Sequence, residues 1–132
     1  MRVLSLPLFL FLFMAAPLAV NAMAAKSKIT AVAFHADWCG SCQKIGPQLE
    51  KARGQADLDN MDVLFVKLDL TNATTRHQSA LLASAIGLGD FYKENNGKTG
   101  FVLLVNENGE HVGKITKEHS SKDIIDLIKS KL

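Results

Sequence analysis

The chain has 132 residues, of which 48% are hydrophobic and 21% are charged, and its formal net charge is +2. This length suits a single small domain, and so nearly balanced a charge argues against nucleic acid as a partner. The only two cysteines lie three positions apart, which excludes a fold held together by long-range disulfides.

Residues 1–24 have the pattern of a secretory signal peptide. Arg2 gives a short positive start, residues 6–20 are mostly apolar, and small residues follow at Ala22 and Ala24. This order is typical of a cleaved leader, with cleavage expected after Ala22 or Ala24. The alternative is an uncleaved membrane anchor, but the apolar core is short for a span of about 20 residues.

Residues 25–132 are then expected to form one exported domain. We expect a location in a bacterial periplasm and no stable membrane insertion once the leader is removed. Since no dimerisation segment is visible in the sequence, a monomer is expected.

Short apolar runs alternate with helical patterns along this domain. Their branched and aromatic residues predict strands at 29–35, 63–70, 101–105 and 111–115. Amphipathic spacing and capping signals predict helices from Cys42 to about Arg53 with a kink at Pro47, over 79–88 after a start signal at Thr71-Asn72, and from Ser120 onward. Residues 54–62 and 89–99 show neither pattern and are predicted to be loops.

Strands that alternate with helices pair in parallel through right-handed crossovers, whereas the late hairpin adds antiparallel strands. The sequence therefore predicts an α/β fold in which a central mixed β-sheet is flanked by helices on both faces.

The two cysteines stand at the predicted junction between the first strand and the first helix, in Cys39-Gly40-Ser41-Cys42. Unpaired N–H groups at a helix start stabilise a thiolate and lower its pKa from about 8.5 to between about 3.5 and 7.5. A bridge over this spacing closes almost no loop, so a structural role explains it poorly. We predict that Cys39 is the nucleophile and Cys42 the resolving cysteine. Gly40 allows close approach of a partner, and Ser41 can satisfy a free N–H group.

The motif and its surroundings resemble the thioredoxin superfamily. Besides the C-x-x-C pair, the matches are Trp38 before it, Pro47 after it, Lys67 on the second strand and Asn108-Gly109-Glu110 in the last hairpin. The resemblance implies a thioredoxin-like fold and thiol–disulfide exchange with protein substrates. It also implies a partner that recharges the pair and no cofactor beyond the Cys39–Cys42 disulfide.

Two runs, Ala36–Cys39 and Lys67–Asn72, resemble the exported or membrane-tethered thiol reductants of this superfamily. Other positions depart from the family pattern. Ala33 stands where the resemblance implies a buried aspartate, and Gly100 or a neighbour stands where it implies a cis-proline. The segment 89–98 has no counterpart in a minimal thioredoxin, so substrate choice is open.

Several supporting residues have two interpretations. His35 is either a packed strand histidine or a charge that stabilises the Cys39 thiolate. Lys67 either tunes the local charge or is an ordinary surface lysine. Trp38 either covers the pair and contacts a partner or simply packs. Phe91 and Tyr92 either line the substrate groove beside the cysteine pair or anchor their loop.

Metal binding is the main alternative for the cysteine pair. Zinc sites need two further ligands, and His77, His111 and His119 lack the spacing to supply them. Copper(I) held by the two cysteines and His35 is another possibility, because soft thiolates favour it. The competing function is therefore a non-catalytic binding module that holds a soft metal ion or a partner protein.

Overall fold

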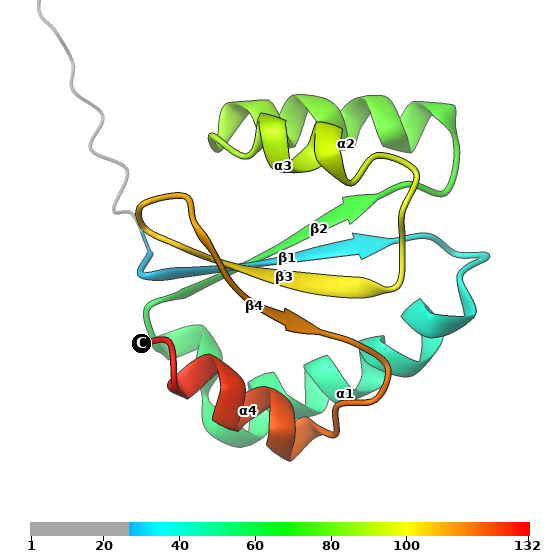
Figure 1. The fold of residues 1–132 in the computed structure, drawn as a ribbon. Coiled ribbons are helices and arrows are strands. Elements are labelled where there is room, and N and C mark those ends of the chain that lie inside the picture. Colours follow the sequence, from blue (N-terminus) through cyan, green and yellow to red (C-terminus); the bar gives the residue numbers. More distant parts are fainter. Residues whose placement is uncertain (1–26) are drawn as a thin grey trace, which may run out of the picture.

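The computed structural model describes residues 27–132, so the predicted leader and its cleavage sites lie outside the described residues. A four-stranded sheet forms the middle layer, with α2 and α3 on one face and α1 and α4 on the other (Figure 1). The predicted mixed sheet covered by helices on both faces is confirmed. Within residues 27–132, none of the helices combines the length and apolar character that a membrane crossing requires.

The elements follow in the order β1 (Ile29–His35), α1 (Gly40–Ala56), a 3₁₀ turn η1 (Leu58–Asn60), β2 (Val63–Asp69), α2 (Ala73–Ala85), α3 (Gly89–Glu94), β3 (Phe101–Asn106), β4 (His111–Ile115) and α4 (Ser121–Lys129). The strand order is β2-β1-β3-β4. β1 is parallel to β2 and antiparallel to β3, and β3 pairs antiparallel with β4.

β1 is buried on both faces, as its nearly continuous apolar sequence predicts. Ala31 belongs to the core under α1 and α4, whereas Val32 and Phe34 belong to the core under α2 and α3. The ring of Phe34 stacks on that of Phe101 in β3, with centroids 5.0 Å apart. The carboxyl end of β1 is therefore fixed from both sides.

Two segments predicted to be loops are partly helical. α1 continues to Ala56, and the polar segment after it forms η1 around Leu58, whose side chain is fully buried. In the second segment, Tyr92 is buried and anchors the short helix α3. In both places one or two buried side chains order a stretch whose average composition is polar.

The predicted helix starts are confirmed in detail. Asn72 caps α2 with a reciprocal hydrogen bond to Thr75, and Ser120 forms the predicted capping box with Asp123. α1 runs through Pro47 without an interruption of the helix.

Candidate functional site

Cys39 and Cys42 form a disulfide at the junction between β1 and α1, with their Cα atoms 5.3 Å apart. Cys39 is the N-cap residue of α1, and its Sγ accepts a hydrogen bond of 3.2 Å from the backbone N–H of Cys42. In the reduced protein this N–H and the other free N–H groups of the first turn would face the Cys39 sulfur. They stabilise a negative charge there, which suits Cys39 for nucleophilic attack.

The Sγ atom of Cys42 faces the sheet. It lies 3.7 Å from the carbonyl oxygen of Phe34, and the same oxygen accepts a hydrogen bond of 2.9 Å from the N–H of Gly100. After reduction the Cys42 thiol can donate to this oxygen. Because that bond favours the protonated thiol, the position suits a resolving cysteine that is held neutral until it is needed.

Gly100 lies directly on the cysteine pair. A Cβ atom there would come within 2.7 Å of Ser41 Cβ and 3.3 Å of Cys39 Sγ, and the glycine has a φ of +88°. Every peptide bond in residues 27–132 is trans. The position where the resemblance implies a cis-proline thus holds a glycine whose backbone packs against the motif.

Trp38 stands beside the pair with 62% of its surface exposed. Its indole N–H donates to the carbonyl of Thr71 at 3.0 Å, and the backbone N–H of Asp37 donates to Thr71 Oγ1 at 3.0 Å. Cys39 and Cys42 are themselves buried, at 7% and 5% exposed, so the indole beside them in the chain is the exposed apolar surface of the motif.

Asp69 holds Thr71 in place. Its Oδ1 accepts from the Thr71 hydroxyl at 2.6 Å and from the Thr71 N–H at 2.8 Å. The hydroxyl hydrogen bond is the largest cause of a lowered pKa of the Asp69 carboxyl, which nearby Lys67 and His35 also favour. Through Thr71, the loop after β2 therefore fixes the loop between β1 and α1 that carries Trp38.

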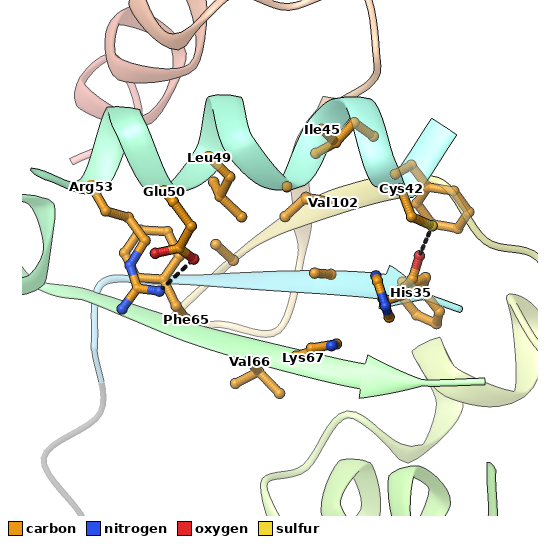
Figure 2. Close-up of a pocket in the computed structure, with 15 residues that line it drawn as sticks. His35, Cys42, Ile45, Leu49, Glu50, Arg53, Phe65, Val66, Lys67 and Val102 are labelled. Carbon is orange, nitrogen blue, oxygen red and sulfur yellow. Dashed lines mark hydrogen bonds and ion pairs between the residues drawn. The ribbon is translucent and has the colours of Figure 1, made fainter. Parts of the chain in front are cut away.

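A groove of about 290 Å³ runs between α1 and the face of β1 and β2 (Figure 2). Cys42 and His35 lie at one end, and Glu50 and Arg53 at the other. Of the predicted supporting residues, His35 and Lys67 line this groove, which Cys42 shares and Cys39 does not.

The other supporting residues predicted within α1 do not line this groove. Gly40 is exposed at the start of α1, with open space where a Cβ would be, and Pro47 is exposed on α1 and does not line the groove. The N–H of Cys42 is bound by Cys39 Sγ, so the capping role considered for Ser41 is not observed.

Phe91 and Tyr92 do not line the groove. They pack in the core under α2 and α3, and the Tyr92 hydroxyl donates to the Arg76 carbonyl at 2.8 Å. The anchoring interpretation is the one that the structure supports.

Two contributors to the site were not predicted from the sequence, the carbonyl of Phe34 and the Asp69–Thr71 pair. An acid two positions before a threonine at a strand end is a local signal for such a turn. The backbone oxygen of Phe34 has no signal in the sequence, because its place depends on the packing of β1.

Residues 27–132 contain no cluster of three or more His, Cys, Asp or Glu side chains that could hold a metal ion.

The family model named Thioredoxin matches residues 19–85, about half of the chain. Thioredoxin-1 of Saccharomyces cerevisiae is 31% identical over 91 residues, which are 69% of this chain and 70% of the yeast protein. The chain belongs to the thioredoxin family. Proteins of this family act on protein disulfides through the redox-active cysteine pair and without a cofactor.

Thioredoxin of Ictalurus punctatus is 45% identical over 49 residues, which are 37% of this chain and only 44% of that protein. Among solved structures, StoA from Bacillus subtilis superposes with a TM-score of 0.54 at 22% identity, covering 80% of this chain and 85% of StoA. The superposition on StoA confirms the thioredoxin-like fold. The chain thus spans less than half of the length of the Ictalurus punctatus protein, and its family membership and paired cysteines are the basis of the activity proposed below.

The packing of Gly100 against the motif predicts a cost for any side chain there. Gly100→Ala should lower the free energy of unfolding through two effects, a left-handed φ that costs about 1–2 kcal/mol and a collision with Ser41 that adds about 1–3 kcal/mol. Gly97→Ala is the matched control, since Gly97 has a φ of +80° but open space around its Cβ position. Urea denaturation of the oxidised proteins measures both, and equal losses in the two variants would show that Gly100 is not in tight contact with the motif.

Proposed function

We propose that this protein is an exported thiol–disulfide oxidoreductase that reduces disulfides in partner proteins through Cys39 and Cys42. The observation that carries the proposal is the hydrogen bond from the Cys42 N–H to Cys39 Sγ at the start of α1. It supports a thiolate at Cys39 in the reduced protein, three residues from a second sulfur within bonding reach.

The reaction has two steps. The Cys39 thiolate attacks one sulfur of a partner disulfide, forms a mixed disulfide and releases the partner's other sulfur as a thiolate. Cys42 then loses its proton and attacks Cys39 Sγ, so the Cys39–Cys42 bond forms and the bond to the partner breaks. The partner leaves with both sulfurs reduced, and a second redox partner must restore the dithiol.

Two features support reduction of proteins as opposed to small molecules. Trp38 offers an exposed apolar surface, and Gly40 leaves open space beside the attacking sulfur. Both suit contact with an extended segment of a partner chain. The direction of electron flow rests on the resemblance of Ala36–Cys39 to thiol reductants, and a reduction potential near about −270 mV, not about −120 mV, would agree with it.

Substitution of each cysteine separates the two steps. In an insulin reduction assay with dithiothreitol, Cys39→Ser should fall to the uncatalysed rate, because no nucleophile remains at the helix start. When reduced Cys42→Ser protein is mixed with insulin after dithiothreitol has been removed, it should form the mixed disulfide but fail to release it, so a covalent adduct should accumulate on non-reducing gels. The non-catalytic binding module would instead show no turnover in the wild-type protein, and full activity of Cys39→Ser would contradict the proposal.

Export is proposed from the pattern of residues 1–24 alone. Expression of the full chain in a bacterium should yield a periplasmic protein that begins at Met23 or Ala25, as intact-mass measurement of the fractionated protein can show. The family match begins at residue 19 and so overlaps the proposed leader. A protein recovered with residues 1–22 still attached would contradict a cleaved leader.

A further inference from the structure

We propose that His35, oriented by Asp37, accepts the proton of the Cys42 thiol through water in the groove between α1 and the sheet. The inference rests on the proposed function and names a residue that acts in its second step. During that step the Cys42 thiol must become a thiolate before it can attack Cys39, and its Sγ faces the carbonyl of Phe34, which cannot take up a proton.

Water in the groove can carry that proton away from Cys42. Two of the residues that line the groove with Cys42 are small, Ala33 on β1 and Gly46 on α1, and the space at a Gly46 Cβ position is open. The groove volume of about 290 Å³ is several times the roughly 30 Å³ that one water molecule takes up. A water-mediated transfer from Cys42 to a side chain of the groove is therefore possible.

The charged and titratable side chains that face His35 or share its groove come from three neighbouring segments. They are Asp37 in the loop after β1, Lys67 and Asp69 on β2, and Cys42 on α1, with Glu50 and Arg53 at the far end of the groove. The groove residues on β3, Phe101 and Val102, carry no charge.

The other groove residues do not match this role. The ammonium group of Lys67 has no lone pair to offer at neutral pH, although its positive charge favours a thiolate nearby. The Glu50 carboxylate is paired with Arg53 at 3.1 Å and lies mostly in solvent, at the end of the groove away from Cys42. Imidazole is the side chain that ordinarily takes up a proton near neutral pH.

Asp37 sets the orientation of the ring. Its Oδ1 lies 3.2 Å from His35 Nε2, and because an ionised carboxylate only accepts, Nε2 must carry a hydrogen. In the neutral ring Nδ1 is then the basic nitrogen. His35 is a half-buried wall of the groove at the level of Cys42 (Figure 2). Within residues 27–132 its side-chain hydrogen bond uses Nε2, which leaves Nδ1 open to a groove water.

The step balances without any further reactant. The Cys42 proton passes by water to Nδ1 of His35, and the thiolate electron pair forms the bond to Cys39 Sγ. The Cys39–partner bond breaks, and its electron pair leaves on the partner's sulfur. The imidazolium then returns its proton to solvent or to that sulfur, which leaves His35 neutral for the next cycle.

The reaction of the reduced protein with 5,5′-dithiobis(2-nitrobenzoate) resolves the two steps in a stopped-flow instrument. Cys39 attack releases the first thionitrobenzoate at a rate proportional to reagent concentration, and Cys42 attack releases the second at a rate independent of it. His35→Gln should slow the second release about 100-fold or more at pH 7 and leave the first release unchanged. The difference should narrow as the pH rises, because hydroxide can then take the thiol proton in place of His35.

His77→Gln, on the exposed surface of α2, is the control and should match the wild type. If His35→Gln does not fold, Asp37→Asn keeps the imidazole and should show the same pH-dependent slowing to a smaller degree. A second release that is equally fast at pH 7, or slowed equally at every pH, would overturn the role of His35. Absence of any second release from the wild-type protein would instead overturn the proposed function.

Discussion

The chemistry of this protein depends on one hydrogen bond, from the backbone N–H of Cys42 to Cys39 Sγ. It exists because Cys39 takes the N-cap position of α1, where a polar side chain is ordinarily found. A sulfur in that place is the acceptor for the helix start, and it gains most when it is negatively charged. One residue thus caps the helix and supplies the reactive thiolate.

The rest of the fold keeps the two sulfur atoms in unlike surroundings. Cys39 faces the helix start and the backbone of Gly100, whereas Cys42 faces the carbonyl of Phe34 and the groove. The stacking of Phe34 on Phe101 fixes that carbonyl, and the N–H of Gly100, the residue before β3, donates to it. The first surroundings favour charge and the second favour a neutral thiol, which is the order of ionisation that two-step exchange needs.

Much of this follows from the sequence, because strand alternation, helix caps and turn residues are local signals. The buried run of β1, the cap at Ser120 and the cysteine pair at a strand-to-helix junction were all predicted and found. The short helix α3 was missed, since it is ordered by the burial of Tyr92, a long-range effect that a polar segment conceals.

The surroundings of the site were harder to predict than its cysteines. The sequence linked His35 with Cys39, yet His35 lines a groove with Cys42, because both side chains face the space between β1 and α1. Asp69 accepts hydrogen bonds from Thr71, and the carbonyl of Thr71 accepts one from Trp38. The bond between Thr71 and Trp38 joins loops more than 30 positions apart in the chain. Contacts of this kind depend on the register of β1 against β2, which no short motif encodes.

The central claim is that backbone dipoles make Cys39 acidic, and its rate of alkylation as a function of pH tests this most directly. In reduced Cys42→Ser protein, where Cys39 is the only thiol, iodoacetamide labelling should reach half its maximal rate at a pH well below the value of about 8.5 for a free cysteine. A midpoint at or above that value would contradict the account.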